Sequence, residues 1–367
     1  TAVTSGSLQT NGQALATGAL NLKAASLDLQ GSTTGSTGAD VTLSATTGDI
    51  HAAQATISTP GLLSISATAG QKLDSSKAQI SGGQLSIDVG EINNTEGVIQ
   101  QTDAASGAAN PVAGIHSAGA INNSAGRIVA NAQDFALVSG GLLDNTDGMI
   151  GHAGSGQLRV DTAGLHNARG KIIGNGATTL TSSADVDNTG GMVAGQQSVT
   201  ATATGWDNTQ GTLVAVQGDL NLHTTTNAVK NAAGLIQADN DIRLTLDGAG
   251  NQLQNAQGKI VSGRDAILST GQMDNDAGLV AAGRNLSIDT HEQALSNQAS
   301  RSSTGSLGLV AGAQLDIHSG TLSNQGGLIS ARTDLNITSS GAINSTEKNA
   351  QAAQIYSGAH LNLQSTG

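Results

Sequence analysis

A chain of 367 residues with 50 glycines and aromatic residues at only 1 % of its positions lacks the large side chains that normally fill a thick globular interior. Its net charge of -12 disfavours nucleic acid and anionic membranes as partners, because both are bound through an excess of Lys and Arg. The absence of cysteine excludes disulfides and thiolate metal sites, and no apolar run approaches the roughly 18 residues of a transmembrane helix, so we expect no membrane insertion.

Short segments in which apolar and polar residues alternate occupy the first 91 residues. Val41–Leu43, Leu63–Ile65 and Leu85–Ile87 alternate in this way and recur every 22 residues. Period-two alternation is typical of half-buried β-strands. The chain starts with Thr1 and shows no signal peptide, so we expect it to be a segment of a longer protein.

From residue 92 onwards one unit repeats, mostly at intervals of 20 to 24 residues, and it can be written apolar-x-Asn-x-x-Gly-x-apolar. Its asparagines are Asn94, Asn123, Asn145, Asn167, Asn188, Asn208, Asn231, Asn255, Asn275 and Asn324. Its glycines, three residues later, are Gly97, Gly126, Gly148, Gly170, Gly191, Gly211, Gly234, Gly258, Gly278 and Gly327. An eleventh unit opens at Asn297, but it lacks the glycine and a longer insert follows.

One such unit is too short to bury its own apolar face, whereas stacked copies cover one another and pair their backbones. No segment shows a sustained 3.6-residue period with helix caps. We therefore predict an all-β fold, a right-handed parallel β-helix (solenoid) with roughly 20–24 residues per coil. We expect residues 1–91 to form coils without the Asn/Gly turn and residues 92–367 to form coils with it, in one continuous solenoid.

Two roles are open for the repeated asparagine. Stacking would align the asparagines along the solenoid, where each amide can bond to the asparagine of the next coil. Alternatively, each asparagine merely suits a tight turn. We favour the ladder, because Ser and Asp would serve a turn and are rare at this position. The glycine is expected to mark a corner at which a Cβ would clash.

Three inserts interrupt the repeat, at residues 100–118, 298–308 and 345–354. Inserts in repeat proteins form loops on one face, where they are either tolerated excursions or contact sites. We favour tolerated excursions, because all three inserts are small, polar and poor in side chains that could anchor a partner.

Acidic pairs are the candidates for chemistry, since polysaccharide-cleaving enzymes need carboxylates that converge in a groove. The pairs are Asp185 with Asp187, Asp239 with Asp241, and Asp274 with Asp276. We interpret them as solvated residues of turns, where Asp is common. The eight histidines show no metal-ligand spacing. We therefore predict no catalytic, cofactor-binding or metal-binding residues, no cofactor and no enzymatic activity.

The remaining conspicuous residues are one tryptophan and a few cations. Trp206 stands at an apolar position of its unit, and we interpret it as a core residue. Arg264 and Arg284 occupy equivalent places on neighbouring coils and are expected to stack into a small basic spot, and Lys171 and Lys259 directly follow turn glycines. Such spots suit a sulfated glycan, but a solvated surface is the favoured interpretation.

The segments "LDNTDGMIG", "VDNTGGMVAG", "LQNAQGKIVSGRDAIL" and "MDNDAGLVAAGRNLSI" resemble the haemagglutinin repeats of filamentous haemagglutinin. The resemblance is strong over residues 92–337 and weaker on either side. This family comprises very large exoproteins of two-partner secretion in Gram-negative bacteria, including adhesins and the stalks of contact-dependent growth inhibition proteins.

The resemblance implies a secreted or cell-surface location outside the outer membrane, and export through an outer-membrane β-barrel transporter. It also implies an unidentified host-cell or bacterial receptor, protein or glycan. No secretion domain, toxin domain or Arg-Gly-Asp motif is recognisable, so no binding residue is carried over. We expect a structural shaft segment of a filamentous adhesin that mediates or supports cell adhesion. The stalk of a contact-dependent inhibition effector is the alternative, and a carbohydrate-active β-helix enzyme is a distant one.

Overall fold

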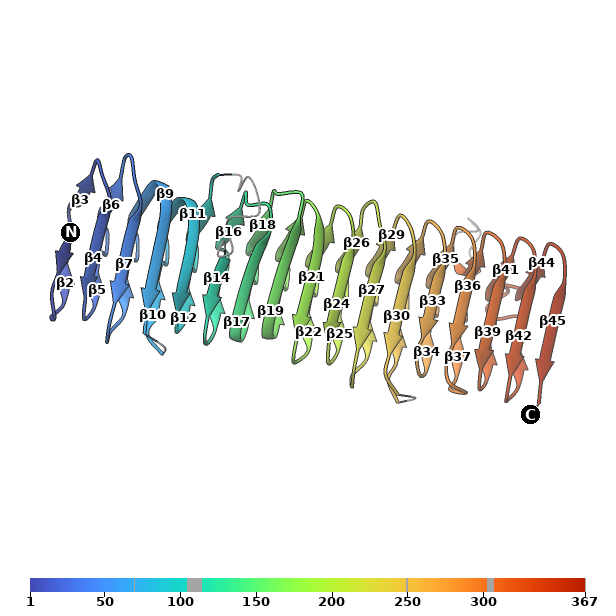
Figure 1. Cartoon of the computed structure of the whole chain (residues 1–367). Helices are drawn as coiled ribbons and strands as arrows, with labels where there is room; N and C mark the ends of the chain where they lie inside the picture. Colours follow the sequence, from blue (N-terminus) through green and yellow to red (C-terminus); the bar gives the residue numbers. More distant parts are fainter. Residues whose placement is uncertain (69, 104–113, 249, 302–306, 367) are drawn as a thin grey trace. The chain divides into compact units, whose positions relative to one another are not determined.

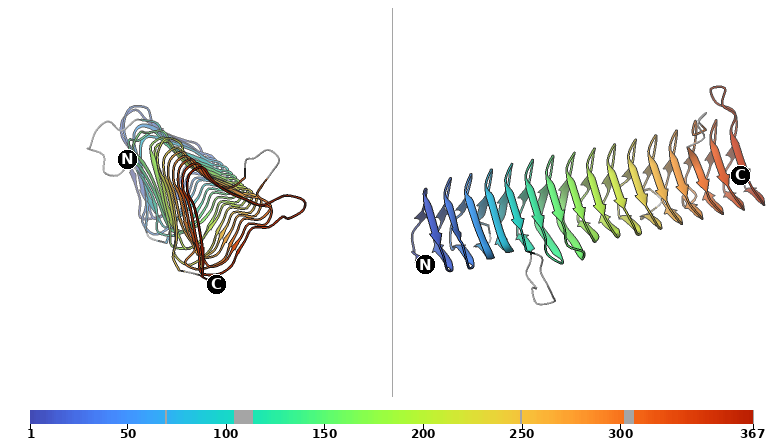
Figure 2. Two further views of the ribbon diagram at one scale, coloured as in Figure 1. Left: turned by 90° about the vertical axis from the view of Figure 1, so that its right-hand side faces the viewer. Right: turned by 90° about the horizontal axis from the view of Figure 1, so that it is seen from above.

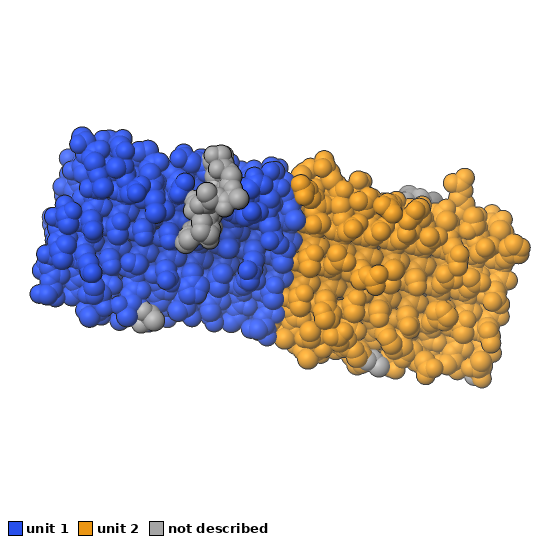
Figure 3. Space-filling view, viewed as in Figure 1, with its two compact units in different colours: residues 1–183 blue, residues 184–367 orange. Residues whose placement is uncertain are grey.

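A computed structural model describes residues 1–68, 70–103, 114–248, 250–301 and 307–366. Every helix or strand assigned within these ranges is a β-strand, and the strands of successive coils pair in parallel (Figure 1). The predicted all-β parallel β-helix is thereby confirmed. The chain forms two compact units, residues 1–183 and residues 184–367 (Figure 3), and each is described by itself.

Three parallel ladders build unit 1, and the end-on view of Figure 2 shows its coils following a three-sided path. The first ladder contains β1 (Ala2–Val3), β4 (Leu20–Ala24), β7 (Val41–Ala45), β9 (Thr56–Ala67), β11 (Gln79–Val89), β14 (Gly114–Ser117), β17 (Phe135–Asp144), β19 (Gln157–His166) and β21 (Ala177–Ser182). The second contains β2 (Leu8–Gln9), β5 (Leu27–Asp28), β8 (Ile50–His51), β10 (Lys72–Asp74), β12 (Glu91–Asn93), β15 (Ile121–Asn122) and the ends of β17 and β19. The third contains β3 (Gln13–Ala16), β6 (Thr33–Ser36), the starts of β9 and β11, β13 (Val98–Gln101), β16 (Arg127–Ala130), β18 (Met149–His152) and β20 (Lys171–Gly174).

Unit 2 repeats this plan. Its first ladder contains β24 (Val199–Ala203), β27 (Leu220–Thr224), β30 (Ile242–Leu246), β33 (Ala266–Ser269), β36 (Leu286–Asp289), β39 (Leu315–Ser319), β42 (Leu335–Ser339) and β45 (Leu361–Ser365). The second contains β22 (Val186–Asp187), β25 (Trp206–Asp207), β28 (Val229–Lys230), β31 (Leu253–Gln254), β34 (Met273–Asp274), β37 (Leu295–Ser296), β40 (Leu322–Ser323) and β43 (Ile343–Asn344). The third contains β23 (Met192–Gly195), β26 (Thr212–Ala215), β29 (Leu235–Ala238), β32 (Lys259–Ser262), β35 (Leu279–Ala282), β38 (Gly308–Ala311), β41 (Leu328–Ala331) and β44 (Gln354–Ser357).

The alternation of apolar and polar residues decides which side chains enter the core. In β27, Leu220 and Leu222 are buried while Asn221 points outwards and is exposed. In register, Leu220 pairs with Ile242 of the next coil, so apolar side chains stack directly on one another. The core is accordingly a narrow column of Leu, Ile, Val and Ala, with Phe135 and Trp206 as its largest members. Burial of each Leu or Ile side chain stabilises the fold by about 1.5–3 kcal/mol, so every added coil stabilises the stack.

Strand β45 shows what a coil loses when no further coil covers it. Leu361 and Leu363 occupy the same register as Leu335 and Ile337, which are fully buried. They are 48 % and 46 % exposed, because β45 is the last strand that the structure describes in its ladder. Burial in this fold is therefore a property of neighbouring coils rather than of the sequence of one coil.

The inserts leave the register of the ladders intact. The insert at 345–354 forms a small turn with an antiparallel bridge between Lys348 and Gln351, and it projects from the coils of unit 2 (Figure 2, right). Strand β44 follows it and pairs normally with β41. Lys348 Nζ donates to Gln298 Oε1 at 2.6 Å, so this insert lies against the start of the insert at 298–308. Residues 104–113 and 302–306 of the other two predicted inserts lie outside the described residues.

Candidate functional site

The repeated asparagines lie at the turn between the second and third ladders, and each side chain is fully buried. In unit 1, Asn94 Nδ2 donates to Asn123 Oδ1 at 2.8 Å, and the same bond joins Asn123 to Asn145 and Asn145 to Asn167 at 2.7 Å. In unit 2 it recurs at 2.7–2.8 Å along the row Asn188, Asn208, Asn231, Asn255, Asn275, Asn297 and Asn324. We call these two rows the asparagine ladder.

Serine hydroxyls continue the ladder where the asparagines stop. Ser75 Oγ donates to Asn94 Oδ1 at 3.1 Å, and Asn324 Nδ2 donates to Ser345 Oγ at 3.1 Å. Asn297 belongs to the ladder although its unit carries Ser300 in place of the glycine. The buried polar groups of the ladder therefore have partners along its whole length, as buried amides require.

The coil at Asn208 shows how the turn is built. Asp207 Oδ1 accepts the N–H of Thr209 at 3.0 Å, and the Asn208 carbonyl accepts the N–H of Gly211 at 2.9 Å. Between them, Gln210 has a φ of 55°, in the left-handed region. The Asn208 amide also contacts the Gly211 carbonyl at 3.3 Å, so one buried side chain ties the turn to itself and to the next coil.

A left-handed residue stands two positions after the asparagine in coil after coil. These residues are Glu96, Ala125, Asp147, Arg169, Gly190, Gln210, Ala233, Gln257, Ala277, Ala299 and Gly326. Such a conformation costs a non-glycine residue roughly 1–2 kcal/mol, which the hydrogen bonds of the buried turn must offset. The turn glycine itself needs no positive φ, so its role is different from that of the residue before it.

Close approach between coils explains the turn glycine. A Cβ on Gly211 would lie 2.3 Å from the Asn188 carbonyl oxygen of the preceding coil, far inside the contact distance. The same carbonyl clash, at 2.0–2.4 Å, is found at Gly97, Gly126, Gly148, Gly170, Gly234, Gly258, Gly278 and Gly327. Gly191 closes the same turn, with its N–H donating to the Asn188 carbonyl at 3.0 Å.

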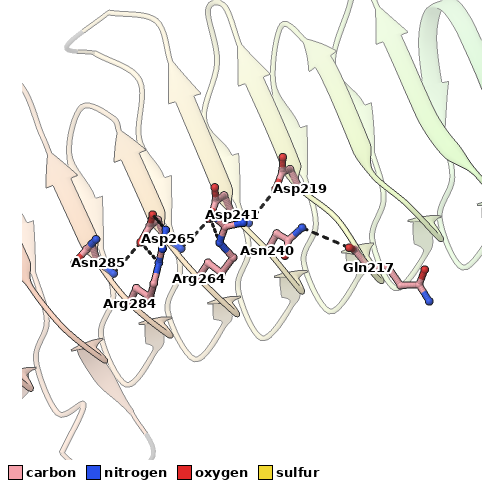
Figure 4. A network of polar contacts seen from close by, with 8 residues as sticks. All are labelled: Gln217, Asp219, Asn240, Asp241, Arg264, Asp265, Arg284 and Asn285. Carbon is pink, nitrogen blue, oxygen red and sulfur yellow. Dashed lines mark hydrogen bonds and ion pairs between the residues drawn. The ribbon is translucent and has the colours of Figure 1, made fainter.

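A second row, which the sequence analysis missed, consists of carboxylates that accept a backbone N–H from the next coil. Asp219 Oδ1 accepts from Asp241 at 3.2 Å, Asp241 from Asp265 at 3.1 Å, and Asp265 from Asn285 at 3.1 Å (Figure 4). In unit 1, Asp40, Asp49 and Asp134 do the same. The sequence pattern that could have predicted this row is an Asp or Asn directly before a strand of the form apolar-x-apolar.

The two arginines expected to form a basic spot are neutralised by this carboxylate row. Arg264 Nε lies 3.6 Å from Asp241 Oδ1, and Arg284 grips both oxygens of Asp265 (Figure 4). The Arg284 guanidinium holds the pKa of the Asp265 carboxyl below its ordinary value. The expectation of a free basic spot at Arg264 and Arg284 is therefore wrong, because each stacked arginine meets the aspartate of the preceding coil.

The acidic pairs proposed for the enzyme alternative are separate turn residues. Asp187 and Asp274 cap their own turns by accepting the N–H two residues later, at 2.9 Å each. Asp276 Oδ1 accepts from Ser296 Oγ at 2.6 Å. Asp185 accepts hydrogen bonds from Thr204 and Asn227, which hold its pKa below the ordinary value, and Asp239 is exposed at a bend. The carboxylates of these pairs, Asp239 excepted, thus accept structural hydrogen bonds.

No His, Asp and Glu side chains of the described residues form a group of three or more that could hold a metal ion. Trp206 is 1 % exposed, as expected for a core residue. Within the ranges covered by the structure, no helix is long and apolar enough to cross a membrane.

Comparison with known proteins gives two matches. The haemagglutinin repeat family model matches residues 1–74, 183–252, 231–299 and 293–367. The chain is 30% identical to "Toxin CdiA" of Yersinia pestis over 301 residues, a match that covers 72% of this chain and 8% of that protein. The chain thus spans less than a tenth of the curated relative's length. No solved structure matches it.

Removal of one ladder amide should destabilise unit 2. We expect Asn208→Ala to lower the free energy of unfolding by about 1–3 kcal/mol, because Asn188 and Asn231 each lose a buried partner. Urea unfolding followed by circular dichroism measures this. Asn221→Ala, at an exposed outward position of the same unit, serves as the control and should stay within about 0.5 kcal/mol of the parent. Equal stability of the two variants would contradict a stabilising role for the ladder.

Gly258→Ala should be poorly tolerated, because its Cβ would lie 2.0 Å from the Asn231 carbonyl oxygen. We expect the free energy of unfolding to fall by about 2 kcal/mol or more, because the added Cβ forces apart the coils that contain Asn231 and Asn255. Gly250→Ala is the matched control, since nothing lies within 4 Å of the Cβ built there. Thermal unfolding of both variants decides the matter, and a similar midpoint for the two would show that close approach does not select the glycine.

The stability of unit 2 should fall in acid partly through Asp185. Hydrogen bonds from Thr204 and Asn227 lower its folded-state pKa from 3.8, so its carboxylate stabilises the fold above the unfolded-state value and this contribution is lost as the pH falls through the folded-state value. We expect Asp185→Asn, and likewise Thr204→Val, to reduce the difference in unfolding free energy between about pH 6 and about pH 3. An unchanged difference in both variants would exclude this residue as a source of the acid sensitivity.

Proposed function

Because the chain belongs to the haemagglutinin repeat family, we propose that it is a structural shaft segment of a large filamentous adhesin, secreted or held at the cell surface of a Gram-negative bacterium. The asparagine ladder is the observation that carries this proposal. It uses the one residue type repeated in every unit for bonds between coils, and it leaves that residue buried and unavailable to a ligand.

The mechanism of such a shaft is mechanical. Each coil contributes three short parallel strands and a layer of buried Leu, Ile and Val, and each coil of the asparagine repeat adds one amide of the ladder. Stability in repeat folds is approximately a sum of units and nearest-neighbour interfaces, so load and stability are distributed over all coils. The hydrogen bonds between coils hold neighbouring coils at a fixed separation of about 4.8 Å.

Export and recognition partners follow from the family and from composition. We propose an outer-membrane β-barrel transporter as the export partner, since the family is one of two-partner secretion. The absence of cysteine suits this route, because a disulfide would hinder the threading of an unfolded chain. The receptor is a protein or glycan on a host cell or on another bacterium.

A second candidate is the stalk of a toxin-bearing surface protein. The specific observation in its favour is the similarity to the Toxin CdiA of Yersinia pestis, of which the chain matches 8%. A match confined to so small a share of that protein fits a repeated stalk, whose coils this chain would supply.

Binding of the purified, fluorescently labelled chain to epithelial cells and to Gram-negative bacteria tests the proposal. We expect saturable binding to epithelial cells that excess unlabelled chain displaces. A variant whose 345–354 turn is shortened to the length of the neighbouring coils reports whether that insert contributes. Saturable binding to bacteria alone would favour the toxin stalk, and absence of saturable binding to epithelial cells would overturn an adhesive role for this segment.

A further inference from the structure

The outward side of the third ladder in unit 2 is largely apolar, and the shaft role does not account for it. In β35, Leu279 and Ala281 point outwards, before and after the buried Val280. The parallel register places outward residues in two columns along the eight strands of this ladder. They are Met192, Thr212, Leu235, Lys259, Leu279, Gly308, Leu328 and Gln354 in the first column, and Ala194, Val214, Gln237, Val261, Ala281, Val310, Ser330 and Tyr356 in the second. We call these two columns the apolar face.

The strands of the apolar face have the sequence pattern of strands that are covered on both sides. Parallel strands buried on both faces are near-continuous runs of apolar residues, whereas strands with one solvated face alternate. Strand β35 reads Leu-Val-Ala-Ala, and β38 reads Gly-Leu-Val-Ala. Strand β30 of the first ladder, by contrast, reads Ile-Arg-Leu-Thr-Leu and alternates. The pattern therefore predicts that the outer side of the third ladder also contacts protein.

The distribution of charge in unit 2 favours a second copy of this chain as the partner. The outward positions of the apolar face, all within described strands, carry no Asp or Glu, and Lys259 is their one charged residue. The outward residues of the other two ladders include Asp289 and Asp316 on the first and Asp207 and Asp274 on the second. Two chains of net charge -12 repel each other through those acidic sides. The apolar face is thus the side of unit 2 that an identical chain can approach with the least repulsion.

The side-chain sizes on the apolar face are complementary under a two-fold axis that runs along the ladder. Such an axis sets the first column of one copy against the second column of the other, coil by coil. Leu279 then meets Ala281 of the second copy, a large side chain against a small one. The same pairing of a large with a small residue is obtained for Met192 with Ala194, Val310 with Gly308, and Leu328 with Ser330. Facing residues of unequal size fill the space between two sheets that pack about 10 Å apart.

The area of the apolar face suits a weak and specific contact. Its eight strands, stacked about 4.8 Å apart and each about 13 Å long, present roughly 500 Å² on each copy. A total of about 1,000 Å² lies at the lower end of specific protein–protein interfaces. We therefore expect a dissociation constant in the micromolar range, about 1–100 μM.

We propose that the apolar face of unit 2 binds the apolar face of a second copy of this chain, side by side and with both chains running in the same direction. The direction follows from the pairing of sizes, because a two-fold axis across the middle of the face would instead set Leu279 against Lys259 of the second copy. This pairing goes beyond the proposed shaft role and does not depend on it, since failure of the chain to bind cells would leave the association of the purified chain unchanged.

Analytical ultracentrifugation of the whole 367-residue chain, from about 1 μM to about 200 μM, tests the pairing. We expect a reversible monomer–dimer equilibrium that high salt strengthens, because salt screens the repulsion between the acidic sides. Ala281→Asp should weaken the dimer by about tenfold or more, since it places a carboxylate in the centre of the contact without a partner. Ser287→Asp adds the same charge at an outward position of β36, in the same coil but outside the apolar face. This control should change the dissociation constant by less than about twofold.

Opposite charges at the two central positions test the direction. With both chains in the same direction, the carboxylate introduced by Ala281→Asp faces the ammonium introduced by Leu279→Lys when the two variants are mixed. We expect the mixed dimer to be about tenfold or more tighter than the dimer of either variant with itself, as measured by sedimentation velocity with one variant fluorescently labelled. With the chains in opposite directions, Ala281 would face Val261 of the second copy, and mixing would give no such gain.

Three outcomes would overturn the proposal. One is a chain that stays monomeric up to about 200 μM, well above the expected dissociation constant. Equal association of Ala281→Asp and Ser287→Asp would place the contact elsewhere, such as at the exposed Leu361 and Leu363 of β45. A mixture that binds no tighter than the single variants would exclude the common direction. Should Ala281→Asp lower the thermal unfolding midpoint, Val310→Lys on β38 replaces it and should weaken association by about tenfold.

Discussion

The asparagine ladder and the carboxylate row both depend on one constraint, the parallel stacking of equivalent residues at the spacing of neighbouring β-strands. Two asparagines in successive coils meet at 2.7 Å only because the backbone ladders on both sides hold them in register. The carboxylate row of Asp219, Asp241 and Asp265 uses the same spacing to reach the backbone of the next coil. A shift of one residue in any ladder would break all of these bonds together.

The same constraint decides where strain is accepted. The turn between the second and third ladders brings a left-handed residue and a glycine next to each other, as at Gln210 and Gly211. The left-handed position accepts many residue types, since its side chain points to solvent, whereas the glycine position faces a carbonyl of the neighbouring coil. The repeated glycine is therefore required because the turn packs closely against the neighbouring coil, and not because its own backbone needs a positive φ.

The fold could be predicted from the sequence because ten units match the same repeat. The alternation of apolar and polar residues, as in Leu220–Leu222, also identifies the buried side of each strand. Features that depend on which residues of different coils face each other were out of reach. The pairing of Arg264 with Asp241 requires the register, since those residues are far apart in sequence. The left-handed residues had no signal at all, because Glu96, Ala125 and Asp147 share no side-chain chemistry.

The asparagine ladder also has a direction. Every Nδ2 donates towards the coil that follows in the chain, and every Oδ1 accepts from the coil that precedes it. Aligned amides polarise one another, so such a row is a chain of parallel dipoles in which each bond strengthens the next. A stack that grows from its amino-terminal end always presents an amide donor to the incoming coil, and the incoming asparagine meets it with the oxygen. The two ends of each row therefore differ chemically, since the amino-terminal end presents an acceptor oxygen and the carboxy-terminal end an amide donor.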